Sequence, residues 1–210
     1  MKGAIFDVDG TILDSMNMWV DITDDFFKEH GIDISREEVV AYQGMSFEES
    51  LVQVHDNFLP DMSVKEMLDE FSRRAERAYL NTVMPKDGVC EYIRSLFERG
   101  VKIAVATSGY SHLCKAAFKR IGIYPYVSEY AFSSEVGCSK TNPDVYLLAA
   151  KRIELLPQEC TVFEDILAGA RSAKSAGFNV ITVADSTNVG DRDELIKVSD
   201  RFIERWDELI

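Results

Sequence analysis

Short apolar runs alternate with amphipathic stretches over most of the chain. Five runs rich in Val, Ile, Ala and Phe are bounded by polar residues or Gly, which is typical of buried parallel strands: residues 4–6, 101–106, 130–132, 161–163 and 180–183. Between most of them lie stretches with the apolar spacing and end residues of helices: 89–98, 111–121, 145–153 and 167–176. Repeated strand and helix segments predict an α/β fold with a doubly wound parallel sheet.

The segment from residue 15 to residue 83 breaks this alternation. It contains no convincing strand, and it carries three S-x-x-E capping boxes, each followed by apolar residues at helical spacing: Ser35 with Glu38, Ser46 with Glu49, and Ser63 with Glu66. We therefore expect an all-helical domain at residues 15–83, inserted into an α/β domain made of residues 1–14 and 84–210. Most aromatic and methionine side chains of such helices form a helix–helix core.

Composition and charge narrow the possible partners. The chain has 210 residues, of which 46% are hydrophobic and 28% charged, enough for a sizeable core. Its 23 Lys and Arg against 36 Asp and Glu give a net charge of -13, which argues against nucleic acid polymers. No apolar run approaches the roughly 20 residues of a membrane span, and a signal-peptide pattern is missing. We expect a cytoplasmic protein with no membrane partner.

Carboxylates and hydroxyls follow three of the predicted strands. They are Asp7 and Asp9, then Thr107, Ser108 and Gly109, then Glu164 and Asp165. In an open α/β sheet, ligands bind outside the carboxyl ends of the strands. These side chains are therefore expected to converge on one edge of the sheet.

The acidic residues can be interpreted as purely structural or as part of a reactive site. A lone D-x-D-G is more often a turn whose carboxylates accept backbone N–H bonds, and Glu164 and Asp165 also suit a helix start. Strand alternation, however, places Asp7 and Asp9 on the same side, about 7 Å apart. Four clustered carboxylates would repel one another and raise their pKa values, so a bound Mg²⁺ is predicted.

Lys140 and the hydroxyl residues complete the candidate chemistry. Taken alone, Lys140 is best interpreted as a surface lysine, and Thr107 with Ser108 as a polar turn before Gly109, which allows close backbone approach. Together with the acidic residues they offer hydroxyls, backbone N–H groups and a cation around a tetrahedral anion. Such a set is suited to phosphoryl transfer.

At these residues the sequence resembles the haloacid dehalogenase superfamily, in its phosphatase and β-phosphoglucomutase-like branch with a helical cap. The four motifs occur in order: Asp7 to Thr11, then Thr107 with Ser108, then Lys140 with Pro143 and Asp144 downstream, and finally Phe163-Glu164-Asp165. The resemblance covers the whole chain. It implies a Rossmann-like catalytic core at residues 1–14 and 84–210 and a cap domain at residues 15–83.

The resemblance also implies roles for the site residues. Asp7 would attack phosphorus and form an aspartyl phosphate, while Asp9 would protonate the leaving oxygen and later activate water. Thr107, Ser108 and Lys140 would bind the transferring phosphoryl group.

Mg²⁺ is assigned by the same resemblance to the Asp7 side chain, the Asp9 backbone carbonyl and Asp165. Glu164 would support the ion directly or through water. The lysine motif departs from the usual Gly-Lys-Pro-x-Pro-Asp in residues 139–144, where we expect a local loop change rather than loss of function.

The expected cap residues bear on the choice between two reactions. Mutases of the branch carry a basic pair and a histidine in the cap, whereas here Gln43, Phe47 and Trp19 lie in the corresponding stretches. We expect these three to form a mostly apolar lid over the substrate. The predicted function is a phosphatase for a small phosphorylated metabolite; the alternative is a sugar phosphomutase, and the intact acidic set disfavours a noncatalytic binding protein. The particular substrate and the oligomeric state stay open.

Overall fold

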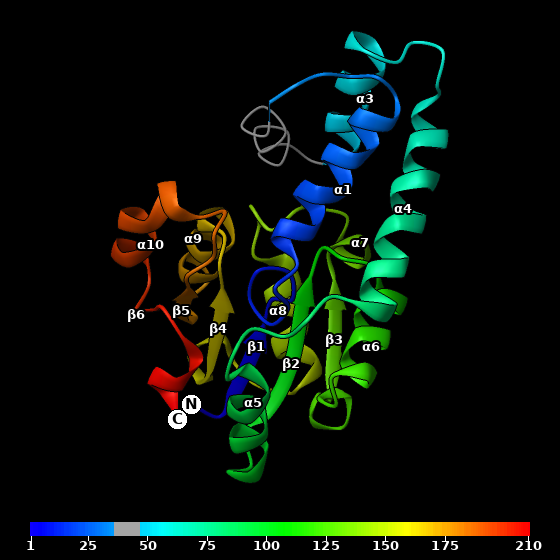
Figure 1. Ribbon diagram of the computed structural model, residues 1–210. Coiled ribbons are helices and arrows are strands. Elements are labelled where there is room, and N and C mark those ends of the chain that lie inside the picture. The colour runs from blue at the N-terminus through cyan, green and yellow to red at the C-terminus, as the bar shows by residue number, and fades with distance from the viewer. Residues whose placement is uncertain (36–46) are drawn as a thin grey trace. The chain divides into compact units, whose positions relative to one another are not determined.

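The chain folds into two compact units in the computed structural model, which describes residues 1–35 and 47–210, without the side chains of residues 47–49. One unit combines Met1–Ser15 with Val83–Ile210, and we call it the α/β unit (Figure 1). The other is Met16–Thr82, and we call it the helical unit. Their functions as catalytic core and cap stay a prediction.

A six-stranded parallel sheet forms the centre of the α/β unit, in the order β3-β2-β1-β4-β5-β6. The strands are β1 (Gly3–Phe6), β2 (Lys102–Thr107), β3 (Glu129–Phe132), β4 (Cys160–Glu164), β5 (Asn179–Val183) and β6 (Arg201–Ile203). The predicted fold class is confirmed. The sequence pattern missed β6 because this short edge strand buries only Ile203 fully and therefore lacks an apolar run.

Helices cover both faces of this sheet. They are α5 (Val89–Glu98), α6 (Ser111–Arg120), α7 (Ser133–Val136), α8 (Asp144–Arg152), α9 (Leu167–Ser175) and α10 (Arg192–Val198). One face packs Ile5 with α8, α9 and α10. On the other, Phe6 stacks on Phe163 with ring centroids 4.5 Å apart, beside Trp206. Ile5 and Phe6 are both fully buried because successive strand residues point to opposite faces.

The loop after β1 carries the first acidic motif. The backbone N–H groups of Ile12 and Leu13 both donate to the Val8 carbonyl, at 2.9 and 2.8 Å. Gly10 has φ 83°, a left-handed conformation that a residue with a Cβ rarely adopts. The tight loop therefore depends on Gly10 and keeps Asp9 close to the end of β1.

The segments that enter and leave the helical unit pair with each other inside the α/β unit. Asp14 N–H donates to the Met84 carbonyl at 2.9 Å, and Lys86 N–H donates to the Ile12 carbonyl at 2.8 Å. Leu13 and Pro85 form an antiparallel bridge between these two hydrogen bonds. We call residues 12–14 and 84–86 the paired linkers.

The helical unit contains α1 (Met16–Glu29), α3 (Phe47–Asn57) and α4 (Val64–Asn81). The predicted capping box at the start of α4 is confirmed, because Glu66 N–H donates to Ser63 Oγ while Ser63 N–H donates to Glu66. The boxes at Ser35 and Ser46 include residues outside the described ranges. Phe26 and Phe71 are buried in the core of this unit, with ring centroids 4.7 Å apart.

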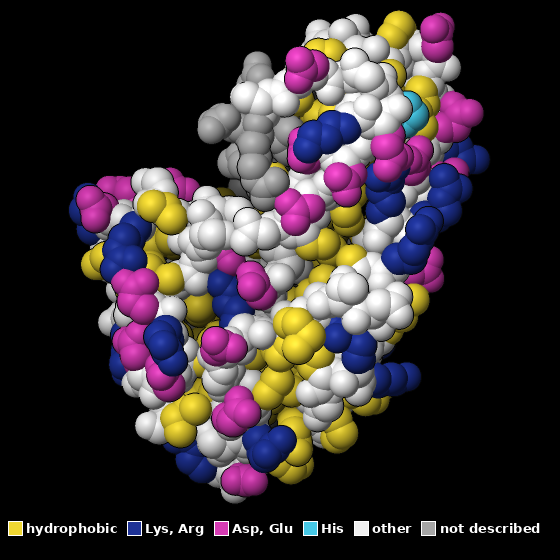
Figure 2. All heavy atoms as spheres, viewed as in Figure 1, with side chains coloured by type: hydrophobic (Ala, Val, Ile, Leu, Met, Phe, Trp, Pro, Cys, Tyr) yellow, Lys and Arg dark blue, Asp and Glu magenta, His cyan; other side chains and the backbone are white. Residues whose placement is uncertain are grey.

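Charged side chains are distributed over both units. Figure 2 shows Asp and Glu interspersed with Lys and Arg on the face it draws, without the continuous basic surface that favours a nucleic acid backbone. None of the described helices combines the length and apolar character needed to cross a bilayer.

Candidate active site

Three buried carboxylates meet where β1 and β4 end. Phe6 pairs with Phe163 across these neighbouring strands, and Asp7 N–H donates to the Phe163 carbonyl at 3.0 Å. This register places Asp7 beside Glu164, the last residue of β4, and Asp165, which follows it. Each of the three offers a carboxylate oxygen within 4.8 Å of the other two.

Lys140 reaches this cluster from the turn that precedes α8. Its Nζ donates to Asp7 Oδ1 and, at 2.5 Å, to Glu164 Oε1. The side chain is only 11% exposed, so the interpretation of Lys140 as an ordinary surface lysine is wrong. A buried ammonium group therefore compensates part of the negative charge of the three carboxylates.

Glu164 has donors from the chain on both carboxylate oxygens. Besides Lys140, its Oε1 accepts from the Tyr146 hydroxyl at 2.6 Å. Its Oε2 accepts from the N–H groups of Asp165 and Ile166, at 3.0 Å each. A Cβ on Gly169 would lie 2.6 Å from the Tyr146 hydroxyl and 2.7 Å from the Glu164 carboxylate, so this arrangement requires a glycine there.

Two carboxylate oxygens of the cluster are suited to bind a cation. Asp7 Oδ2 and Asp165 Oδ2 are buried and have no hydrogen-bond partner among the described residues, whereas Asp165 Oδ1 accepts from Thr11 Oγ1 at 3.1 Å. A buried anionic oxygen is costly unless it is paired or coordinates a metal. Asp7 and Asp165 thus fit a hard divalent cation, and Glu164 fits a supporting position because its oxygens already accept hydrogen bonds.

The protonation of these groups leads to the same conclusion. Burial, with the charge of Glu164, raises the pKa of Asp7 to about 7 against the opposing effect of Lys140. Burial, with the charges of Asp7 and Glu164, raises the pKa of Asp165 well above its usual range. Burial alone would lower the pKa of Lys140, but the carboxylates of Asp7 and Glu164 raise it above its ordinary value. A bound cation would favour ionised Asp7 and Asp165.

Asp9 is not among the three described carboxylates whose oxygens lie within 4.8 Å of one another, whereas the sequence suggested a cluster of four. Its Oδ1 accepts from the Ser15 hydroxyl at 2.6 Å. A Cβ on Gly109 would lie 3.3 Å from Asp9 Oδ2 and 3.3 Å from Thr107 Oγ1, which brings these three residues together. Asp9 is half-buried, whereas Asp7 is 4% exposed, so the two aspartates have different environments.

The hydroxyl residues come from the end of β2. Thr107 is the last residue of that strand, and its Oγ1 accepts from Gly109 N–H at 3.0 Å. The Ser108 hydroxyl lies 3.0 Å from the hydroxyl of Ser133, which follows β3. The predicted convergence of Thr107, Ser108 and Gly109 on the carboxyl ends of the strands is therefore observed.

The predicted lid residues belong to a different part of the chain. Trp19 lies on α1, half-buried and edge-on to Tyr79 with ring centroids 6.4 Å apart. Gln43 and the side chain of Phe47 lie outside the described residues. Their predicted contact with substrate stays a prediction.

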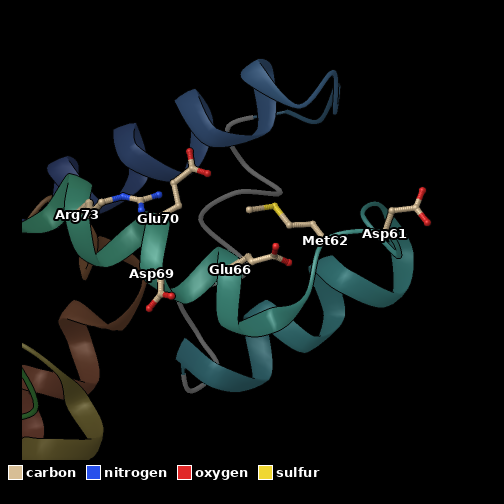
Figure 3. A pocket seen from close by; sticks show the side chains of 6 residues that line it. All are labelled: Asp61, Met62, Glu66, Asp69, Glu70 and Arg73. Atoms are coloured by element: carbon tan, nitrogen blue, oxygen red, sulfur yellow. The ribbon is translucent and has the colours of Figure 1, made fainter.

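A hollow of about 340 Å³ lies on the helical unit along α4 (Figure 3). Its lining is mostly charged: Asp61, Met62, Glu66, Asp69, Glu70 and Arg73. None of the predicted site residues whose side chains are described lines it. Four of its six lining residues are carboxylates, whose negative charge would repel a phosphate ester.

Two residues of the site were not predicted from the sequence. Ser15 holds Asp9, and Tyr146 holds Glu164. Tyr146 could have been found, because a tyrosine on the buried face of a helix needs a partner for its hydroxyl. Ser15 is a small polar residue at the end of a loop, and its position gives no such indication.

Comparison with known proteins identifies similar sequences over most of the chain. A family model described as haloacid dehalogenase-like hydrolase matches residues 4–183. Hexitol phosphatase A of Escherichia coli K12 is 30% identical over 184 residues, which cover 87% of this chain and 82% of that protein. A phosphorylated carbohydrates phosphatase of Thermotoga maritima is 26% identical over 199 residues, 90% of this chain and 88% of its own.

A solved structure with the same fold comes from a protein described as a putative beta-phosphoglucomutase of Thermotoga maritima. It superimposes with a TM-score of 0.84 over 100% of this chain and 97% of its own, at 23% identity. At that identity the likeness concerns the fold alone.

Proposed function

Because the chain belongs to the haloacid dehalogenase-like hydrolase family, we propose that it is a Mg²⁺-dependent phosphatase that hydrolyses a small phosphorylated carbohydrate through an aspartyl-phosphate intermediate. Because its relatives are named as phosphatases, the chain is assigned to the phosphoric monoester hydrolases. The observation that carries the proposal is the pair of buried, unpartnered oxygens on Asp7 and Asp165 beside the Lys140 ammonium group.

The first step forms a covalent intermediate. A carboxylate oxygen of Asp7 attacks phosphorus, and the bond between phosphorus and the ester oxygen breaks. Asp9 gives a proton to the leaving oxygen, so that the carbohydrate departs as an alcohol. The Ser15 hydroxyl holds Asp9 Oδ1 and thereby orients the carboxyl group for this transfer.

The second step returns the enzyme to its starting state. Asp9 takes a proton from water, whose oxygen attacks phosphorus and breaks its bond to Asp7. Inorganic phosphate leaves, and the Asp7 carboxylate is regenerated. Asp9 is suited to both steps because it is half-buried and can exchange its proton, while Asp7 stays buried against Lys140.

The remaining residues stabilise the charge of the phosphoryl group. Asp7, Asp165 and the Asp9 backbone carbonyl would hold Mg²⁺, with Glu164 in support, and the ion would supply electrostatic stabilisation of the phosphoryl oxygens. Lys140 adds a buried positive charge, and Thr107, Ser108 and Gly109 offer a hydroxyl or N–H group. Fixed donors stabilise a negative charge more strongly in a site of low dielectric constant than in water.

The substrate class comes from the two phosphatase relatives, whose names refer to hexitol phosphates and phosphorylated carbohydrates. We place the reaction in the cytoplasm, where such metabolites occur.

The test is phosphate release from a panel of sugar phosphates, sugar-alcohol phosphates, nucleotides and phospho-acids, with Mg²⁺ and with excess chelator. We expect Mg²⁺-dependent release that is fastest with the carbohydrate esters. Acid quenching during turnover of a ³²P-labelled substrate should leave label on the peptide that contains Asp7. Full activity in chelator, or an unlabelled peptide during rapid turnover, would contradict the mechanism.

Product analysis separates this proposal from a phosphomutase. A mutase returns the phosphoryl group to a second sugar hydroxyl and not to water. Incubation with β-glucose 1-phosphate and catalytic glucose 1,6-bisphosphate should release inorganic phosphate or leave the sugar unchanged. Efficient formation of glucose 6-phosphate would replace the hydrolase with the mutase.

A further inference from the structure

Asn188 ties the end of β4 to the loop after β5. Its Nδ2 donates to the backbone carbonyls of Asp165, at 2.9 Å, and Val183, at 3.0 Å. Its Oδ1 accepts from Asp185 N–H at 3.1 Å. Asn188 is 8% exposed, so its amide makes these three bonds in a largely dry environment.

Asp185 and Lys86 form an ion pair directly beside this amide. Lys86 Nζ donates to Asp185 Oδ2 and to the Ala184 carbonyl, at 2.7 Å each. Asp185 Oδ1 accepts from Thr187 N–H at 2.9 Å and from its hydroxyl at 2.7 Å. The side chains of Asp185 and Lys86 are 1% and 14% exposed. The pair thus fixes the loop in which Asn188 lies.

These contacts close a ring around Asp165. Lys86 belongs to the paired linkers, and its backbone N–H donates to the Ile12 carbonyl at 2.8 Å. Thr11, the residue before Ile12, donates a hydrogen bond from its hydroxyl to Asp165 Oδ1 at 3.1 Å. Asp165 is therefore held through its backbone by Asn188 and through its side chain by Thr11, and Lys86 connects the two sides.

We propose that Lys86, Asp185 and Asn188 are positioning residues that hold Asp165 in the geometry required for the divalent cation. The inference rests on the proposed function, because it assigns these residues to the same metal site. None of the three belongs to the acidic cluster, and none contacts the reacting groups. They act through the Asp165 backbone and the loop that carries Thr11.

The network is expected to affect Mg²⁺ affinity through the orientation of Asp165. Mg²⁺ demands near-octahedral geometry at short distances, so a small rotation of Asp165 moves its Oδ2 away from the ion. Partners that orient a metal ligand typically contribute about 10–100-fold in metal affinity. The same network touches the paired linkers through Lys86, so a change in linker geometry would reach Asp165 by this path.

The buried ion pair suits a positioning function better than a stabilising one. Replacing a buried ion pair by apolar residues of similar volume is often neutral for stability, since desolvation offsets the attraction. Here burial would raise the pKa of Asp185, yet hydrogen bonds from Lys86 and Thr187 hold it below its ordinary value. The pair stays charged and keeps a directed geometry in the loop behind Asp165.

The test compares four variants of the full chain with the wild type. Asn188→Leu removes the three bonds at similar volume, Lys86→Met removes the charge, and Lys86→Arg keeps it. Thr182→Val is the matched control, because it deletes a part-buried 2.9 Å hydrogen bond from Thr182, on β5, to Ser199, which follows α10, outside the network. Calorimetric titration of metal-free protein with Mg²⁺ gives the dissociation constant directly. The Mg²⁺ concentration for half-maximal phosphate release gives a second value.

We expect Asn188→Leu to weaken Mg²⁺ binding about 10–100-fold and Lys86→Met about threefold, with near wild-type kcat at saturating Mg²⁺. Lys86→Arg and Thr182→Val should stay within about twofold, even where Thr182→Val lowers the melting temperature. If Asn188→Leu does not fold, the contrast between Lys86→Met and Lys86→Arg decides the question.

Wild-type Mg²⁺ affinity in the first two variants, or equal weakening in Thr182→Val, would overturn the inference and leave the phosphatase proposal intact. A wild-type chain that neither binds Mg²⁺ nor releases phosphate would overturn the proposed function and this inference with it.

Discussion

The two units bury different kinds of side chain. Within the described residues, the helical unit has Ser50 as its one buried polar side chain. Its core consists of apolar residues: Val20, Phe26, Phe27, Ile32, Leu51, Val54, Met67 and Phe71. The α/β unit buries carboxylates, hydroxyls and an amide, and most of them lie at or beyond the carboxyl ends of its strands: Asp7, Thr11, Ser15, Thr107, Ser133, Glu164, Asp165, Asp185 and Asn188.

This difference indicates that the buried residues of the helical unit serve its stability, whereas the buried carboxylates of the α/β unit serve the reaction. Burying Asp7 and Asp165 with oxygens that lack partners destabilises the metal-free α/β unit, so these residues are best explained by function. In the described part of the helical unit, no buried carboxylate oxygen lacks a partner, and ion pairs such as Arg74 with Glu29 and Glu70 lie nearer the surface.

The largest expected effect is the loss of the nucleophile. Asp7→Asn should reduce kcat by at least about four powers of ten, because an amide oxygen cannot replace the anionic nucleophile. The fold should persist, since the amide has nearly the same shape and removes a poorly solvated charge. Phosphate release and thermal unfolding, measured on the same sample, check both parts.

Asp87→Asn provides the matched control, because Asp87 is an exposed aspartate of the same unit. Its activity and melting temperature should equal those of the wild type. Near-normal turnover by Asp7→Asn would contradict the assignment of Asp7, at the end of β1, as the nucleophile.

The helical unit should respond in stability alone. Phe71→Ala leaves a cavity beside Phe26 and should cost about 3–5 kcal/mol in the free energy of unfolding of this unit. Hydrogen exchange should rise across α1 and α4, while Mg²⁺ affinity stays unchanged. Phe58→Ala, at a side chain 37% exposed in the same unit, should cost much less. A loss of Mg²⁺ binding in Phe71→Ala would contradict the separation of the two units.

The sequence predicted the parts of the fold that depend on local pattern. The run at residues 161–163 and the carboxylates after it identified β4 and Asp165 because a buried strand and its end lie next to each other in the chain. Lys140 was expected at the phosphoryl group from its motif, but its two carboxylate partners depend on how β1, β4 and the turn before α8 come together.

The network behind Asp165 could not be predicted. Lys86 and Asp185 are 99 residues apart, and neither stands in a recognisable motif. Asn188 looks like an ordinary loop residue until β5 places it against the Asp165 carbonyl. Long-range pairing of single polar residues leaves no periodic trace in one sequence.

The pH dependence of stability should distinguish the two units through their carboxyl groups. Folded, metal-free protein keeps protons on Asp7 and Asp165 above pH 3.8, the ordinary pKa of these groups, because their pKa values are raised. The unfolded chain has lost those protons, so it binds fewer of them, and the free energy of unfolding falls as the pH rises from about 4 to 7. Mg²⁺ should oppose this fall by binding the ionised carboxylates.

Melting temperatures at pH 5 and pH 8, with chelator and with Mg²⁺, measure this effect. Asp165→Asn should reduce both the pH-dependent loss of stability and the gain with Mg²⁺, since the amide does not titrate. An unchanged pH dependence in Asp165→Asn would show that the buried carboxyl does not contribute.

The smallest expected effect concerns the start of α4. Ser63→Ala removes the side chain that accepts from Glu66 N–H and should cost about 1 kcal/mol in the free energy of unfolding of the helical unit. Hydrogen bonds from Ser63 also lower the pKa of Glu66, so that pKa should move toward its ordinary value in the variant. Ser72→Ala, inside the same helix, is the control and should not destabilise it, because alanine is the better helix former. Chemical denaturation and a carboxyl titration by NMR measure the two quantities. Because the capping box lies in the helical unit, whose described residues include no buried charged side chain, turnover and Mg²⁺ affinity should not change. A shift in either quantity would show that this helix end is coupled to the acidic site.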